Sequence, residues 1–409
     1  MMSSSPRVVG TALLPGGLLG RAVLHIAAGR IEGVELEPPA IVERALRRDG
    51  TALVLSDREV LAPAFVDVHC HGAGGGSAHG ATSQLQLMAE TLLTHGVGSF
   101  LATTVTAPIP DLMVVAHRVA RLVASQVAGQ GASRASALLG LHLEGPALSP
   151  IRSAGHDQDA LVSPALLASS MEDDREAWGA VRAVTLAPEL AGGLELVRRL
   201  AGVGTVASVG HTDADAAVAT EAYEAGARST THLFSGMPPL HHRAPGPVGA
   251  ALISAPFIEL ICDGIHVDAR LLPPIARAIG GDRLVLVSDA LPLAGSRLRR
   301  VSMPGGTARI QGDRAVDPDG SLAGSRLLLD GMVARAVHSG IPLSIALRAA
   351  TENPARLLDL RDRGTLTPGA IADFVVMSRG GRLKRVLAGG AEAQPDGLPG
   401  PGSSRPLLA

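Results

Sequence analysis

The stretch AFVDVHCH, residues 64–71, is a short apolar run that ends in two histidines, and seven similar runs follow it along the chain. They are SFLATTVT (99–106), ALLGLHLEG (137–145), VRAVTLAPE (181–189), TVASVGHT (205–212), RSTTHLFS (228–235), IELICDGIH (258–266) and RLVLVSDA (283–290). Segments rich in alanine and leucine separate these runs. Apolar strands that alternate with helices are typical of a parallel sheet covered on both faces. Eight such units predict an α/β protein with a (β/α)8 TIM-like barrel.

The two ends of the chain have a different pattern from the barrel segment. RAVLHIAAGRIEGVEL (21–36) and GTLTPGAIADFVVMSRGGRLKRVLAGG (364–390) both have the character of short strands joined by turns. We therefore expect a barrel over residues 63–360, and a small β-sandwich domain formed by residues 1–62 together with residues 361–390. The remaining tail, 391–409, is rich in proline, glycine and serine, and it is predicted to be disordered.

Composition narrows the partners and the location of this 409-residue chain. A net charge of −2 argues against nucleic acid and against an anionic membrane surface as partners. The two cysteines, Cys70 and Cys262, do not suggest a disulfide framework. No uninterrupted apolar run is long enough to span a bilayer, because Pro15, Gly16 and Gly17 divide the apolar start. A cytoplasmic protein is expected.

Chemically active side chains stand at the ends of the predicted strands, where barrel enzymes carry their catalytic groups. These residues are His69, His71, Glu144, His211, His232, His266 and Asp289. Three or four nitrogen and oxygen donors with one open position are what a catalytic Zn²⁺ or a similar divalent ion requires. A carboxylate that is not needed as a ligand can then act as the base for water, and Asp289 suits that role.

The pair His69 and His71 is a weaker signal when taken alone. Side chains at i and i+2 of a strand point to the same face, so the two imidazoles are expected to project together. A structural histidine that is hydrogen-bonded in the core remains the alternative to a metal ligand. The glycines among residues 72–76 would let the backbone turn tightly beside a metal.

Together these residues resemble the amidohydrolase superfamily, and the sequences around them are similar to the N-acetylglucosamine-6-phosphate deacetylase family. The resemblance runs from Arg21 to about Gly390. The motifs that carry it are GLHLEGPALSP (140–150), VTLAPE (184–189), SVGHTDAD (208–215), THLFSGMPPL (231–240), APGPVGAAL (244–252), CDGIHVD (262–268), LVSDALPLAG (286–295), GSLAGS (320–325), ATENPARLLDL (350–360) and RGTLTPGAIADFVVM (363–377).

The resemblance implies metal-dependent hydrolysis of the N-acetyl amide of N-acetylglucosamine 6-phosphate, in amino-sugar catabolism or cell-wall recycling. It implies that Glu144, His211 and His232 bind one divalent metal. Asp289 would take a proton from the attacking water and give it to the leaving amine, and His156 would hydrogen-bond the amide carbonyl. The residues implied to bind substrate are Gly155, His156, Ser235, Gly236, Arg243, Asp263, His266, Leu322, Ala323 and Gly324. Arg243 and His266 are the implied phosphate ligands, and a homodimer is expected.

Two features leave the substrate specificity and the number of bound metal ions open. Many relatives have Asn-Ala where this chain has Ser235 and Gly236, so the sugar epimer and the acyl group are not determined. Some relatives lack the His-x-His and hold one metal, whereas others keep it and hold two. Because His69 and His71 are present, one or two divalent ions per subunit are expected, with Glu144 bridging the two. Zinc is the expected metal, with Fe²⁺ and other ions left open.

Other functions compete with this hypothesis. A deacetylase of another N-acetyl amino sugar, with or without a phosphate, would use the same residues. A cyclic amidase of the same superfamily usually bridges two metals with a carboxylated lysine on a barrel strand, but the only lysine here is Lys384. An adenosine-type deaminase would need a glutamate soon after His211, and the first one is Glu221. A barrel that binds without catalysing is the remaining alternative.

Overall fold

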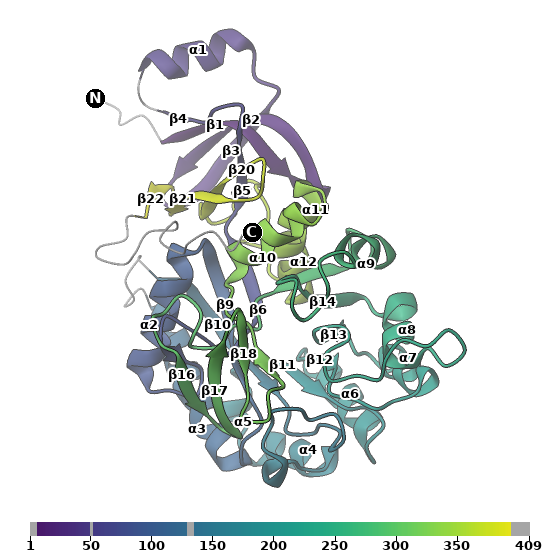
Figure 1. The fold of residues 1–409 in the computed structure, drawn as a ribbon. Coiled ribbons are helices and arrows are strands. Elements are labelled where there is room, and N and C mark those ends of the chain that lie inside the picture. Colours follow the sequence, from purple (N-terminus) through teal and green to yellow (C-terminus); the bar gives the residue numbers. More distant parts are fainter. Residues whose placement is uncertain (1–5, 50–51, 129–134, 394–409) are drawn as a thin grey trace.

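The computed structural model describes residues 6–49, 52–128 and 135–393, and it confirms the barrel of parallel strands (Figure 1). Each of the eight predicted runs overlaps one strand. The barrel strands are β6 (Phe65–Cys70), β9 (Val97–Thr104), β10 (Ala137–Glu144), β11 (Val181–Leu186), β12 (Val206–Val209), β13 (Ser229–Thr230), β14 (Phe257–Ile261) and β15 (Leu284–Val287). They pair in chain order, and a parallel bridge between Cys70 and Ala290 brings the last strand beside the first, so the barrel is nearly closed.

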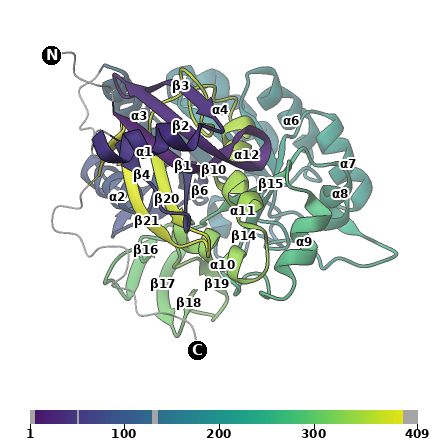
Figure 2. The ribbon, with the colours of Figure 1, turned by 90° about the horizontal axis from the view of Figure 1, so that it is seen from above.

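Helices cover the outside of this barrel, with α2 and α3 on one side and α6–α9 on the opposite side (Figure 2). The helices of this part of the chain are α2 (Thr82–Thr94), α3 (Ile109–Val127), α4 (Pro164–Asp173), α5 (Arg175–Trp178), α6 (Gly193–Gly202), α7 (Ala216–Glu224), α8 (Gly246–Ser254), α9 (Leu272–Ile279), α10 (Leu329–His338), α11 (Leu343–Ala350) and α12 (Glu352–Leu357). In α3, the buried residues Leu112, Val115, Ala116 and Val119 have the i, i+3, i+4, i+7 spacing of one helix face. This spacing explains why the segment forms a helix against the sheet.

The two ends of the chain meet in one β-rich unit beside the barrel, as predicted, and its strands belong to one hydrogen-bonded sheet rather than to two separate ones (Figure 1). Its strands are β1 (Arg7–Leu14), β2 (Leu18–Ala27), β3 (Arg30–Leu36), β4 (Ala52–Val54), β5 (Glu59–Pro63), β20 (Phe374–Ser378), β21 (Leu383–Ala388) and β22 (Ala391–Glu392). Antiparallel pairing of β20 with β5 joins the C-terminal strands to the N-terminal ones. The helix α1 (Ala40–Asp49) and the 3-10 turn η1 (Pro15–Gly17) belong to the same unit.

A shared apolar core holds this unit together, since side chains from both ends of the chain pack in one cluster. Leu24 and Leu61 from the N-terminal strands belong to the same buried cluster as Phe374 and Leu387 from the C-terminal strands. We keep the predicted boundaries, 1–62, 63–360 and 361–390, as a proposal. Of the tail predicted to be disordered, Ala391–Glu392 forms β22, and residues 394–409 lie outside the described residues.

A small antiparallel sheet is inserted between β15 and α10, and the sequence patterns did not indicate it. It consists of β16 (Arg300–Met303), β17 (Gly306–Gln311), β18 (Arg314–Val316) and β19 (Leu322–Gly324). A two-residue hairpin, β7 (Gly72–Ala73) with β8 (Gly76–Ser77), follows the first barrel strand, and a 3-10 turn, η2 (Gln158–Ala160), follows the third. Among the described helices, none combines the length and the apolar character that crossing a lipid bilayer requires.

Candidate active site

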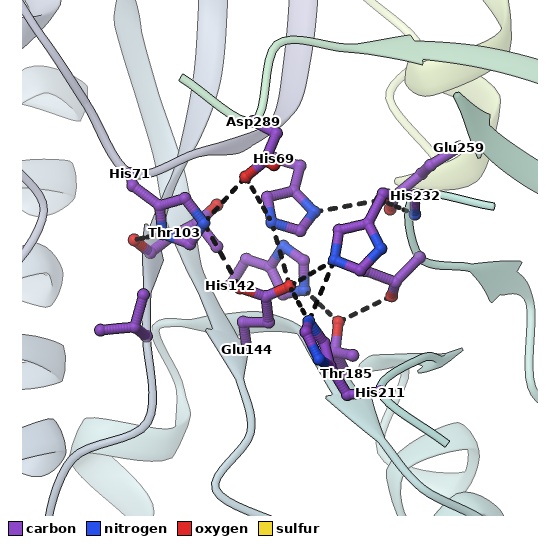
Figure 3. A network of polar contacts seen from close by, with 12 residues as sticks. His69, His71, Thr103, His142, Glu144, Thr185, His211, His232, Glu259 and Asp289 are labelled. Atoms are coloured by element: carbon purple, nitrogen blue, oxygen red, sulfur yellow. Dashed lines mark hydrogen bonds and ion pairs between the residues drawn. The ribbon is translucent and has the colours of Figure 1, made fainter. Parts of the chain in front are cut away.

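The predicted metal ligands and Asp289 come together at the carboxyl ends of the barrel strands (Figure 3). His69 lies within β6 and His71 directly after it, while Glu144 is the last residue of β10. His211 and His232 each follow their strand by two residues, and so does Asp289. All of these side chains are buried. Residues that follow their parallel strands by the same number of positions lie at the same height along the barrel axis, and this explains why residues so far apart in sequence meet.

The backbone is unusual at three of these positions. The φ angle is +47° at His211, +23° at His232 and +46° at Asp289, in the left-handed region that residues with a Cβ atom seldom adopt. Such a conformation costs about 1–3 kcal/mol and persists only where the surrounding structure imposes it. It occurs here at the ends of β12, β13 and β15, where the chain leaves its strand and turns each side chain toward the centre.

Glu144 is the centre of the cluster. Its Oε1 lies 2.8 Å from Nε2 of His232 and 3.2 Å from Nε2 of His211. Its Oε2 lies 3.3 Å from Nε2 of His71 and 3.4 Å from Nε2 of His156. Burial raises the pKa of Glu144, but the surrounding histidines outweigh this and hold it well below its usual value. The carboxylate is therefore charged, and each of its oxygens faces different imidazoles.

The orientation of the imidazoles prepares them to bind a cation. Nδ1 of His71 lies 3.0 Å from the carbonyl oxygen of Thr103, and Nδ1 of His211 lies 2.8 Å from that of Arg152. A carbonyl oxygen only accepts hydrogen bonds, so Nδ1 carries a proton in both rings, and Nε2 is the nitrogen that faces the cluster and can bind a cation once it is deprotonated. A second hydrogen bond of this kind is what orients histidines that bind metals.

Two further observations test whether a divalent ion fits. Among the described residues, Nε2 of His69 is buried and has no hydrogen-bond partner. The Nε2 atoms of His211 and His232 are only 3.1 Å apart and both face Oε1 of Glu144, so one cation can contact all three atoms. Three overlapping groups bring their ligand atoms within 4.8 Å of one another, namely His69–His71–Asp289, His69–Glu144–His232 and Glu144–His156–His211. The residues fit a metal ion.

Asp289 stands at the edge of the cluster, next to the open pocket. Its Oδ1 lies 3.2 Å from Nε2 of His71, and its Oδ2 lies 3.9 Å from Nε2 of His266. Burial alone would raise the pKa of Asp289, but the hydrogen bond with His71 and the charges of His69, His71 and His232 lower it to about 2. Asp289 is therefore ionised at neutral pH and is able to accept a proton.

His156 presents a hydrogen-bond donor to the pocket. Its Nδ1 accepts a hydrogen bond from the backbone N–H of Thr106, at 3.1 Å, so the proton of the neutral ring is on Nε2. Burial, together with the neighbouring His211, lowers the pKa of His156 to about 4. The ring is neutral at pH 7, and its Nε2–H points toward Glu144 and the pocket.

A pocket of about 360 Å³ opens above these residues. Of the residues predicted to bind substrate, it is lined by Gly155, His156, Ser235, Gly236, His266, Leu322, Ala323 and Gly324. The side of the pocket formed by residues 303–324 comes from the inserted sheet.

Two residues predicted to bind substrate are not part of this lining within the described chain. Arg243 lies on an exposed segment before α8 and is not among the residues that line the pocket. Asp263 is buried behind His266, and its Oδ2 lies 2.7 Å from Nδ1 of that histidine. Its Oδ1 accepts hydrogen bonds from the backbone N–H groups of Ile265 and His266. Asp263 therefore orients a pocket residue and does not itself face the pocket.

The sequence patterns also missed residues that the structure places at the site. Met303 and Asp317 of the inserted sheet line the pocket, and nothing in their local pattern marked them. His142 is buried with its ring 4.7 Å from that of His69, centroid to centroid. Glu259 is buried in β14 and contacts His69. Its signal was a single carboxylate inside the apolar run FIELI, which is costly to bury unless it has a partner.

Gly236 is required by the packing around His211. Its φ angle is +60°, and a Cβ atom added there would lie 2.7 Å from Nδ1 of His211. We expect Gly236→Ala to displace the imidazole and to lower both the bound metal per chain and the turnover, as measured by elemental analysis and an activity assay. The matched control is Gly246→Ala, because Gly246 has a φ angle of +58° and nothing within 4 Å of an added Cβ. Equal effects of the two substitutions would trace the loss to backbone conformation alone.

A parallel barrel with histidines and carboxylates at the carboxyl ends of its strands defines a metal-dependent hydrolase of the barrel type. The chain belongs to the amidohydrolase family, whose sequence profile matches residues 60–393. It is a hydrolase that acts on amide bonds.

Relatives narrow the resemblance further. The chain is 36% identical over 326 residues to N-acetylglucosamine-6-phosphate deacetylase of Bacillus subtilis (strain 168), and the aligned region covers 78% of this chain and 81% of that protein. It is 32% identical over 374 residues to N-acetylgalactosamine-6-phosphate deacetylase of Escherichia coli O157:H7, and the aligned region covers 90% of this chain and 94% of that protein. The Mycobacterium smegmatis N-acetyl-D-glucosamine-6-phosphate deacetylase was solved in complex with N-acetyl-D-glucosamine-6-phosphate. It matches with a TM-score of 0.83 at 31% identity, over 96% of this chain and 100% of that chain.

Proposed function

We propose that the protein hydrolyses the N-acetyl amide of an N-acetylhexosamine 6-phosphate, with N-acetylglucosamine 6-phosphate as the first candidate, to give the amino sugar phosphate and acetate. The observation that carries this proposal is the arrangement of His71, His211, His232 and Asp289 around Glu144, below a pocket in a chain whose relatives are deacetylases of such sugars. The pocket has the size of a small-molecule site.

Glu144, His211 and His232 would hold the principal divalent ion, for which we propose zinc. His69, His71 and Asp289 would hold a second ion, with Glu144 between the two because its oxygens face different imidazoles. A bound divalent ion supplies Lewis acidity, which makes water a better nucleophile and the amide carbonyl a better electrophile.

The residues of the chain supply proton transfer and charge stabilisation. The ionised carboxylate of Asp289 would take a proton from the attacking water and then deliver it to the leaving nitrogen, since an amine is a poor leaving group unless it is protonated. The Nε2–H of neutral His156 would donate to the amide oxygen as negative charge develops on it.

The sugar and its phosphate would lie along the wall formed by Ser235, Gly236, His266 and the β19 segment Leu322–Gly324. His266 is held in place by Asp263 and is a candidate ligand of the phosphate. Arg243 remains a proposed phosphate ligand, although it lies outside the lining of its own chain.

A homodimer is a further proposal. The exposed hydrophobic residues Leu240 and Ile253 line one shallow pocket together with His241 and His242, which directly precede Arg243 in the chain, and exposed apolar side chains next to one another are typical of contact surfaces. The arginine could then serve a second copy of the chain. We also propose a cytoplasmic location, because a sugar phosphate is charged and does not cross membranes unaided.

The competing hydrolase of cyclic amides is disfavoured by the position of the only lysine. Lys384 is exposed on β21 of the terminal β unit, so it cannot bridge metals inside the barrel. A deacetylase with the other sugar epimer stays open, because one relative is named for N-acetylgalactosamine 6-phosphate and the Ser235–Gly236 pair departs from the Asn-Ala of many relatives.

The test is the release of acetate from a panel of N-acetylated sugars. We expect hydrolysis of N-acetylglucosamine 6-phosphate, and a much lower kcat/KM for the same sugar without its phosphate. N-acetylgalactosamine 6-phosphate serves as the epimer control, and the faster of the two phosphates names the substrate. Release of acetate from none of the phosphorylated sugars by metal-loaded protein would contradict the proposal, and a non-catalytic binding barrel would then be the better hypothesis.

A further inference from the structure

Glu259 is a buried carboxylate in the interior of the barrel, where a purely apolar side chain would cost less to bury. It lies in the middle of β14, between the buried residues Ile258 and Leu260, and its side chain is only 3% exposed. Figure 3 shows Glu259 reaching toward His69 and His232 from the side opposite to His71.

The contacts of Glu259 link two of the candidate metal ligands. Its Oε2 lies 3.1 Å from Nδ1 of His69 and 3.3 Å from the backbone nitrogen of His232. A carboxylate accepts hydrogen bonds, so His69 donates from Nδ1, and Nε2 is the nitrogen that is left to face the site. That Nε2 lies 3.4 Å from Oε1 of Glu144 and 3.7 Å from Oδ1 of Asp289, and it has no hydrogen-bond partner.

His142 fixes the plane of the same ring from a different side. The rings of His142 and His69 meet edge to face with centroids 4.7 Å apart. His142 is itself held by the carbonyl oxygen of Val68, at 3.1 Å, and by Oγ1 of Thr185, at 2.8 Å. His142 therefore restricts where the His69 ring lies, whereas Glu259 determines which of its nitrogens carries the proton.

We propose that Glu259 is a positioning residue that keeps the proton of His69 on Nδ1, so that Nε2 remains a ligand for a divalent ion. The inference rests on the proposed metal-dependent function and adds a residue to it. Through the backbone N–H of His232, the same carboxylate also ties the first barrel strand to the sixth, so the two sides of the metal site are held in one arrangement.

The test is the affinity for zinc, measured by competition with a chromophoric chelator, together with the number of zinc ions per chain. Glu259→Gln keeps the size of the side chain, but its amide NH2 can donate to Nδ1 and leave the proton of His69 on Nε2, facing the site. His69→Asn is expected to lose one zinc ion, and this defines the ion that His69 binds. We expect the same ion to bind 10–100-fold more weakly in Glu259→Gln, which is the usual loss of affinity when the hydrogen-bond partner of a metal ligand is removed.

The matched control is Asp330→Asn. Oδ1 of Asp330 lies 3.1 Å from Nδ1 of His95, the same distance and atom type as the Glu259–His69 contact, but outside the pocket lining. Zinc affinity should not change in this variant. In the His69→Asn background, Glu259→Gln should weaken zinc binding no further, because glutamine keeps an oxygen that can accept the hydrogen bond from the backbone N–H of His232, so only the contact with His69 is altered.

The possible results distinguish a failure of the inference about Glu259 from a failure of the proposed function. Wild-type zinc affinity in folded Glu259→Gln would overturn the inference. An equal loss of zinc affinity from Glu259→Gln in the wild-type and in the His69→Asn background would also overturn it, because it would indicate a role in packing alone. If Glu259→Gln does not fold, as judged by circular dichroism, Glu259→Met removes the carboxylate with an apolar chain of similar length and carries the same expectation. A wild-type chain that binds no divalent ion would refute the proposed function instead.

Discussion

Replacing Asp289 with asparagine is expected to lower turnover by roughly 10²–10⁴-fold, the loss typical of removing a positioned proton-transfer group. This corresponds to about 3–5 kcal/mol in the activation barrier. Asparagine keeps the size of the side chain and its ability to form hydrogen bonds, but it cannot carry a proton from water to the leaving nitrogen. The neighbouring histidines lower the pKa of Asp289 to about 2, so the carboxylate is ionised, and able to act as a base, at neutral pH.

Metal content and turnover must be measured on the same preparation of Asp289→Asn. The ion held by Glu144, His211 and His232 should remain, whereas an ion near His71 is expected to bind less tightly because Oδ1 of Asp289 lies 3.2 Å from that imidazole. Asp268→Asn is the control, since Asp268 is a surface carboxylate that pairs with Arg270. A loss of rate that parallels loss of the principal ion would make Asp289 a ligand, and another residue would have to move the proton.

Removal of the metal should abolish hydrolysis altogether, and adding back a divalent ion should restore it. The physical reason is that His156 is a single neutral donor, which alone does not stabilise the charge that develops on an amide oxygen. The measurement is acetate release after dialysis against a chelator, followed by titration with Zn²⁺, Fe²⁺, Mn²⁺ and Co²⁺ in separate samples. The ion that restores the highest rate at one equivalent identifies the preferred metal.

Circular dichroism before and after chelation is the control for this experiment, because it separates loss of chemistry from loss of structure. The large hydrophobic core includes buried strand residues such as Val184, Leu260 and Val285, which do not depend on the ion, so the secondary structure should persist without it. Full activity in protein shown by elemental analysis to be free of metal would contradict the mechanism proposed here.

The fold could be predicted in outline because its signals are local. A run such as LVLV in β15 is buried on both faces, and a four-residue apolar stretch between helical segments has few alternatives to a parallel strand. The strands at both ends of the chain were also visible as β-rich segments joined by turns. The inserted sheet of residues 300–324 was not, since its strands are short and half exposed and do not alternate with helices.

The candidate site could be predicted at the positions where residue type and strand end coincide. Glu144, His211, His232 and Asp289 were found in this way, and the structure brings them together. Arg243 and Asp263 were predicted from motifs, and the structure leaves both outside the pocket lining of the chain. A motif identifies a residue but does not determine whether its side chain faces the pocket or, as with Asp263, supports a neighbour that does.

The sequence by itself therefore determined the barrel, the β-rich unit formed by the two ends, and the kinds of side chain that stand at the ends of the strands. Hydrophobic periodicity and residue type are properties of short segments, so they can be read without knowledge of long-range contacts. Only the tertiary structure decided which nitrogen of His69, His71 and His211 faces the site, because that depends on partners far away in sequence, such as Glu259 for His69. It also decided the left-handed backbone at His211, His232 and Asp289, since strain of this kind is held in place by the surrounding packing rather than by the local sequence.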